Sequence, residues 1–155
     1  MSETVDVKIN LSSEHWDDRY PGARVYINQE LIHEGLIAEP TELSWSGELE
    51  EGEQVIVVEM YDKRNGDTVQ DDNGNIIKDV ILNIDNISFD DVDLATSTAN
   101  FEDEPDHVVL RASSMYYPKS EYAPEVLDRC INLGWNGRWE LKFSSPTYLW
   151  LLENL

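Results

Sequence analysis

The sequence is poor in cysteine and has no long apolar run. Cys130 is the only cysteine, so one chain can form neither an internal disulfide nor a thiolate metal cluster. No apolar run approaches the roughly 18 residues of a membrane span, and the first residues lack the basic and apolar regions of a secretion signal. We therefore expect a protein made and kept in solution, in a reducing compartment, with no membrane partner.

Positive charge is also scarce. The 155 residues carry 11 Lys and Arg against 32 Asp and Glu, a formal charge of −21. Such a surface repels nucleic-acid phosphates and anionic lipids, which argues against direct nucleic-acid binding. Hydrophobic residues nevertheless make up 41% of the chain, including five Trp, enough to build a core within one domain.

What the chain does have is repeated strand-like alternation over residues 1–95. Apolar residues at every second position predict strands over 5–11, 24–31, 43–45 and 55–61, and one long strand or a bent pair over 80–92. Asn73-Gly74 predicts a hairpin turn. This spacing predicts a mainly β fold, a β-sandwich or jelly roll.

The chain becomes polar and acidic over 93–105, where we place the end of the sandwich domain. Residues 96–155 are predicted to form a small α+β segment packed on the same domain. It has a helix over 124–133, a strand over 138–143 and a helix over 146–155, with Ser145 as the cap of the last helix.

Several aspartates raise the possibility of a calcium site, because calcium binds six to eight oxygen ligands. The candidate ligands are Asp67, Asp71, Asp72 and Asp85. Gly74 does not stand where an EF-hand loop requires its glycine, so a simple hairpin turn is favoured. A second acidic group follows the strand that begins near residue 80, and a solvated face is favoured over a metal site there.

The aromatic residues divide into core and contact candidates. The loop residues Trp16 and Tyr20, and the pair Tyr116 and Tyr117, are the candidates for exposed binding contacts. The other four tryptophans are predicted to lie in the core: Trp45, Trp135, Trp139 and Trp150.

No catalytic motif is present. The three histidines are dispersed, and neither HExxH nor GxSxG occurs. Cys130 lies on the apolar pattern of the predicted helix 124–133, which favours a buried small residue over a nucleophile. We therefore expect a non-catalytic protein.

Two stretches resemble small acidic virion proteins of tailed phages, particularly marine and cyanobacterial ones. The first runs over 48–63, 66–69 and 72–79, and the second over 133–141 and 145–155. The resemblance implies a structural or accessory protein of the tail, neck or capsid surface, made in the host cytoplasm and located in the virion, which binds other virion proteins or its own copies. The strand rhythm also resembles calcium-dependent carbohydrate-binding modules, which implies a host-surface glycan and calcium. A third hypothesis is an acidic DNA mimic that occupies a nucleic-acid-binding protein.

The last predicted helix is apolar on nearly every side. Its candidate assembly contacts are Tyr148, Leu149, Trp150 and Leu152. Such a helix must pack on its own sheet or dock into a neighbouring subunit, because it would otherwise expose an apolar, association-prone patch to solvent. Packing beside Trp135 and Trp139 is the favoured alternative of the two.

Overall fold

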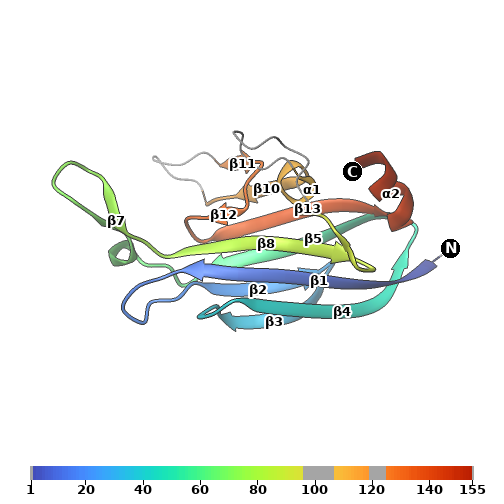
Figure 1. Cartoon of the computed structure of the whole chain (residues 1–155), viewed down its shortest axis with the longest axis horizontal. Helices are drawn as coiled ribbons and strands as arrows, with labels where there is room; N and C mark the ends of the chain where they lie inside the picture. The colour runs from blue at the N-terminus through green and yellow to red at the C-terminus, as the bar shows by residue number, and fades with distance from the viewer. Residues whose placement is uncertain (1, 96–106, 119–124, 155) are drawn as a thin grey trace.

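The chain folds as a mainly β sandwich of two antiparallel sheets (Figure 1). The computed structural model describes residues 2–95, 107–118 and 125–154. The sequence prediction of a β-sandwich with a small C-terminal helix is confirmed. The predicted boundary between 95 and 96 falls beside residues 96–106, which lie outside the described part.

The first sheet has the order β12-β8-β1-β4, with β9 paired to β8. Its strands are β1 (Ser2–Glu14), β4 (Thr41–Glu50), β8 (Ile81–Phe89), β9 (Val92–Asp93) and β12 (Asn132–Leu133). The strict alternation in β1 buries Val5, Val7, Ile9 and Leu11, each at most 1% exposed. The period-two pattern therefore identified the inward face of this strand correctly.

The second sheet has the order β11-β10-β13-β5-β2-β3. Its strands are β2 (Gly22–Ile27), β3 (Glu30–Leu36), β5 (Gly52–Tyr61), β10 (Ser113–Tyr116), β11 (Val126–Asp128) and β13 (Gly137–Ser145). β13 pairs with β5 from Gly137 opposite Met60 to Ser145 opposite Gly52. The segment after residue 96 thus supplies an internal strand of the sandwich.

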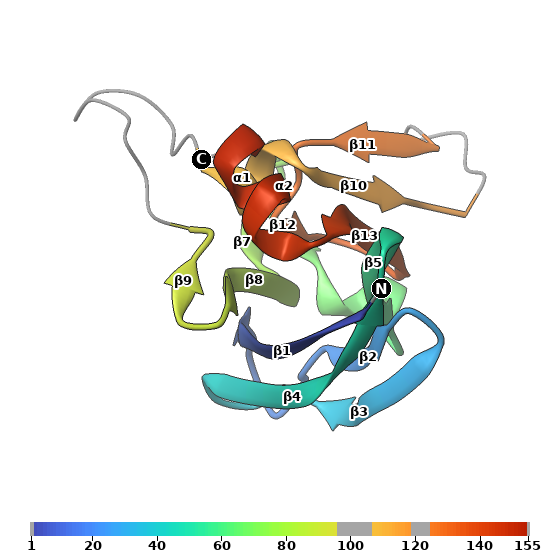
Figure 2. The same cartoon turned by 90° about the vertical axis from the view of Figure 1, so that its right-hand side faces the viewer.

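Small elements lie at the two ends of the sandwich. A 3-10 turn η1 (Asn65–Asp67) and the hairpin of β6 (Val69–Gln70) and β7 (Ile76–Lys78) extend from one end, and the helix α2 (Thr147–Asn154) lies at the other (Figure 1). A one-turn helix α1 (Val108–Arg111) lies near α2 in both views (Figure 2). The predicted turn at Asn73 and Gly74 is confirmed, with Gly74 at φ +83° donating its amide to Asp71.

Two predicted elements are wrong. The single strand over 24–31 is a hairpin, because Asn28 adopts φ +55° and uses its side chain to bind Val55 and Gln54. The second is the helix predicted over 124–133. The described residues of this segment form no helix, since 126–128 form β11 and 132–133 form β12. Here Arg129 adopts φ +61°, and pairing with β10 replaces the local helical preference.

The core lies between the two sheets, with one aromatic cluster near α2. Phe89 and Phe143, from opposite sheets, have ring centroids 4.7 Å apart, and Trp150 of α2 lies 6.1 Å from each. Trp139 is fully buried and donates its indole N–H to the carbonyl of Cys130. The core predictions for Trp139 and Trp150 are therefore confirmed.

The other two core tryptophans differ from the prediction. Trp45 is only partly buried at the edge strand β4, where its indole N–H donates to Glu30 across the open side of the sandwich. Trp135 is 36% exposed, so the prediction that it is a core residue is wrong. Its ring instead lies under the ammonium of Lys63, 5.7 Å from the ring centroid.

Candidate binding surfaces

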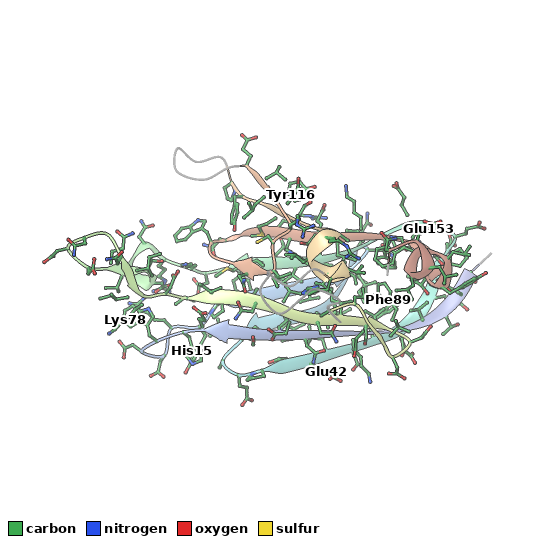
Figure 3. The ribbon with its side chains drawn as sticks, turned by 45° about the horizontal axis from the view of Figure 1, so that its top comes forward. His15, Glu42, Lys78, Phe89, Tyr116 and Glu153 are labelled. Atoms are coloured by element: carbon green, nitrogen blue, oxygen red, sulfur yellow. The ribbon has the colours of Figure 1, made fainter. Side chains whose placement is uncertain are left out.

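The loop that carries Trp16 and Tyr20 lies beside η1 and the β6–β7 hairpin. Asp17 and Asp18 both adopt left-handed φ angles, 51° and 58°, and turn the chain back so that Arg19 donates its amide to the carbonyl of Trp16. Figure 3 shows His15 of this loop and Lys78 of the hairpin at the same end of the sandwich. The contacts between loop and hairpin decide whether Trp16 is free to bind a ligand.

Trp16 ties the loop to η1 and the hairpin. Its indole N–H donates to the carbonyl of Asp67 at 2.7 Å, and the Arg19 guanidinium and Lys78 ammonium lie 5.6 and 4.9 Å from its ring centroid. The residue is half-buried and packs against the core. Because neighbouring cations already occupy the ring, the structure corrects the prediction of a freely exposed stacking surface.

Tyr20 borders a polar hollow of about 320 Å³. Its hydroxyl donates to Asp18 at 3.2 Å, and that hydrogen bond raises the pKa of Tyr20. The hollow is lined mainly by charged side chains, among them Asp17, Asp62 and Arg64. It can accept a small polar group, with Tyr20 as the aromatic side chain at its rim.

The four predicted calcium ligands do not converge. Asp67 is 4% exposed, and its carboxylate binds the Arg19 guanidinium and the Arg64 amide. Asp71 accepts amides within its own turn, chiefly from Asn75, and these hydrogen bonds lower its pKa. Asp72 is exposed at the hairpin tip, and Asp85 is exposed on β8. Within the described ranges, no three His, Cys, Asp or Glu side chains form a candidate metal group.

Tyr116 and Tyr117 have separate environments. Tyr116 is partly exposed on β10, opposite Arg138 of β13 (Figure 3). Tyr117 packs against the core, where burial and the neighbouring Cys130 raise its pKa. Cys130 itself is 5% exposed, and burial raises the pKa of its thiol. The predicted burial of Cys130 is confirmed, although it lies between two strands and not on a helix.

The predicted assembly contacts of α2 divide into an inner and an outer set. Trp150 and Leu151 are 8% and 9% exposed and anchor the helix to the sandwich. Tyr148, Leu149 and Leu152 are 61%, 47% and 78% exposed. The helix therefore packs on its own domain and still presents three apolar side chains to solvent, which neither predicted alternative described by itself.

The N-terminus of α2 is fixed by a residue that the sequence did not indicate. Glu3 of β1 accepts hydrogen bonds at 2.7 Å from the Thr147 amide and from the Ser145 hydroxyl. A carboxylate at this position satisfies an otherwise unpaired helix amide. The prediction that Ser145 caps the helix is wrong, because its hydroxyl binds Glu3.

A groove of about 470 Å³ lies between α2 and the outer side of the second sheet. Its polar side chains come from the two strands β5 and β13 and from the β2–β3 turn, and Trp150 forms part of its wall. The lining includes Asn28, Glu53, Glu140, Lys142 and Ser144. Its volume lies in the range of small-molecule sites, and its amide, carboxylate and ammonium groups can bind hydroxyl groups.

The outer faces of the two sheets differ in charge. The strands of the first sheet contain one cation, Lys8, and eight acidic residues. On the second sheet, paired positions form the row Glu34, Arg24, Glu59, Arg138, with alternating charge. The strands of the first sheet are therefore more acidic than those of the second, which combine both signs.

Comparison of the chain with protein-family models, with curated proteins and with solved structures finds no match. The resemblance to virion proteins thus stays a prediction. None of the described helices has the length and apolar character needed to cross a bilayer.

Proposed function

We propose that this chain is a non-catalytic structural or accessory protein of a phage virion, which binds its neighbours through the outer face of α2. The observation that carries the proposal is the exposure of Tyr148, Leu149 and Leu152 on a helix that the buried Trp150 and Leu151 anchor to the sandwich. Residues three and four positions apart share a helix face, so these side chains form one patch. A patch on a fixed helix loses little conformational freedom on binding.

The size of the patch fits weak, repeated contacts. Full burial of one such side chain contributes about 1.5–3 kcal/mol, and these three are already partly covered. A net binding energy of about 4 kcal/mol corresponds to a Kd of about 1 mM. We therefore expect the isolated chain to be monomeric at micromolar concentration and to bind firmly only where many copies act together.

Mass spectrometry of purified particles of the encoding phage tests the location. The protein should be present in intact virions and should remain after mild washing. Its absence from intact particles would contradict the proposal.

A paired substitution tests the role of α2. The variant Leu149→Ser with Leu152→Ser should lower incorporation into particles while it leaves the melting temperature nearly unchanged, because both side chains are exposed. The matched control is Ile76→Ser with Ile77→Ser, which removes two exposed apolar side chains from the opposite end. Equal incorporation of both variants would exclude the helix face as the contact.

The groove beside α2 supports a second candidate, a carbohydrate-binding module. Its supporting observation is the set of hydroxyl-binding side chains in a groove of about 470 Å³. Glycan-array binding that Glu140→Gln or Lys142→Ala abolishes would favour this function, and a chelator would test whether calcium is required. Trp16→Ala is the control, because its ring is occupied by Arg19 and Lys78 and should not bind sugar.

A further inference from the structure

The chain contains three Asn-Gly pairs, and the structure places each in a different chemical environment. They are Asn65-Gly66 in η1, Asn73-Gly74 in the β6–β7 turn and Asn136-Gly137 at the start of β13. Asn-Gly is chemically labile, because glycine has no side chain to hinder attack of its backbone nitrogen on the asparagine amide. Because the three dipeptides are identical, differences between their reaction rates in the folded protein report the effect of structure and not that of the dipeptide sequence.

Asn136 is held by two hydrogen bonds. Its Nδ2 donates to the Lys63 carbonyl at 2.8 Å, and its Oδ1 accepts the Lys63 amide at 2.9 Å. Gly137 is also enclosed, since an added Cβ would lie 2.5 Å from the carbonyl oxygen of Tyr116. The asparagine side chain cannot rotate toward the Gly137 nitrogen without breaking both bonds.

Asn73 is exposed, but the next amide is engaged. The Gly74 N–H donates to the Asp71 carbonyl at 3.0 Å and thereby closes the hairpin turn. Removal of the amide proton, which must precede attack, therefore costs this turn a hydrogen bond. Asn73 should react more slowly than an unrestrained Asn-Gly pair.

Asn65 has neither restraint. Both Asn65 and Gly66 are exposed, and no atom lies within 4 Å of the position of an added Gly66 Cβ. Gly66 stands in the first turn of η1, where amides have no partner within the helix. Among the described residues, no hydrogen bond is formed by the Asn65 side chain or by the Gly66 amide.

We propose that Asn65-Gly66 is a self-modification site that deamidates in the folded protein. The Gly66 nitrogen loses its proton to a base in the solvent and attacks Cγ of Asn65. The new N–Cγ bond forms as the Cγ–Nδ2 bond breaks, and the departing nitrogen takes a proton from the solvent and leaves as ammonia. Water then opens the cyclic imide at either carbonyl to give aspartate or isoaspartate, with no change of oxidation state.

The isoaspartate product would disturb the contacts that hold Trp16. It inserts one carbon into the main chain of η1, where the Asp67 amide binds the Arg64 carbonyl at 3.0 Å. Asp67 in turn binds the Arg19 side chain and the Trp16 indole. Modification at Asn65 should therefore loosen the loop at this end of the sandwich.

Peptide mapping of the folded protein, aged in mildly alkaline buffer, tests the proposal. We expect loss of the amide first at Asn65, then at Asn73, with Asn136 unchanged. In denaturant the three pairs should react at comparable rates, because the dipeptides are identical. Equal rates at Asn65 and Asn136 in the folded protein, or an intact Asn65 when Asn73 has reacted, would overturn it.

Two variants separate chemistry from stability. Gly66→Ala has open space for its Cβ and should slow conversion of Asn65 several-fold without changing conversion of Asn73. Asn65→Asp has the charge of one product but an ordinary main chain. This variant should keep the melting temperature of fresh protein, whereas aged protein rich in isoaspartate should melt at a lower temperature. Unchanged conversion of Asn65 in the Gly66→Ala variant would contradict attack by the Gly66 nitrogen.

Discussion

Replacing Asp79 by alanine would break a buried ion pair that joins the β6–β7 hairpin to the sandwich. The Lys63 ammonium lies 2.7 Å from Asp79 Oδ1, and the side chains are 1% and 14% exposed. Lys63 also donates to the Gly134 carbonyl, and Thr68 donates to Asp79. The pair therefore connects the start and end of the hairpin with the loop before β13.

The expected cost of Asp79→Ala is about 3–5 kcal/mol in the free energy of unfolding, because a buried ammonium loses its counter-charge. The double variant Lys63→Met with Asp79→Ala should be less destabilised than the single one, since it leaves no buried charge. Asp85→Ala is the control, because its exposed carboxylate should contribute within about 0.5 kcal/mol.

The same pair predicts a pH dependence. Burial acts to raise the pKa of Asp79, but hydrogen bonds from Lys63, Thr68 and the Val80 amide outweigh it, so the pKa is lowered. The carboxylate thus stabilises the fold fully above the ordinary aspartate pKa of about 3.9, and this contribution is lost as the pH falls through the lower folded value. The difference between wild type and Asp79→Ala should shrink in that acid range.

Urea denaturation followed by tryptophan fluorescence measures these free energies. A cost below about 1 kcal/mol for Asp79→Ala near neutral pH would refute the reasoning, because that is the value of a solvent-exposed pair. A double variant as unstable as the single one would likewise show that the buried charge is not the cause.

Further substitutions test the local contacts. Glu3→Ala should cost about 1 kcal/mol in thermal unfolding, because the first turn of α2 loses its carboxylate cap. Gly137→Ala should cost about 1–3 kcal/mol, since its Cβ would lie against the carbonyl of β10, whereas Gly134→Ala has open space and serves as its control. Trp16→Phe should cost about 1 kcal/mol by loss of the indole hydrogen bond to η1, and urea titration that shows no change would mean that this bond contributes nothing.

Strand content was predictable because alternation reports directly which face is buried. The positions of Val5, Val7 and Ile9 follow from period two alone. The helix over 124–133 failed although its apolar residues fit a helical pattern, because Leu127 pairs with Met115 of β10, a separate strand that the local pattern does not reveal. The apolar pattern of a segment does not reveal the strand with which it pairs when that strand comes from another part of the chain.

The candidate site was less predictable for the same reason. Residue type suggested that Trp16 is exposed, whereas its contacts come from Asp67 and Lys78, which are far along the chain. The helix cap from Glu3 joins residues 144 positions apart. By contrast, the apolar side chains of α2 lie close together in sequence, so the sequence indicated their adhesive character but not which of them face water.

The place of β13 between β5 and β10 has a consequence for synthesis and refolding. Until residues 137–145 have left the ribosome, β5 lacks the neighbour on one side that covers its backbone amides. Such pairing between distant residues slows folding and leaves an open strand edge able to bind other chains. A nascent chain stopped before β13 should therefore aggregate, and in the complete protein the burial of Trp139 on β13 should mark the late closure of the sandwich.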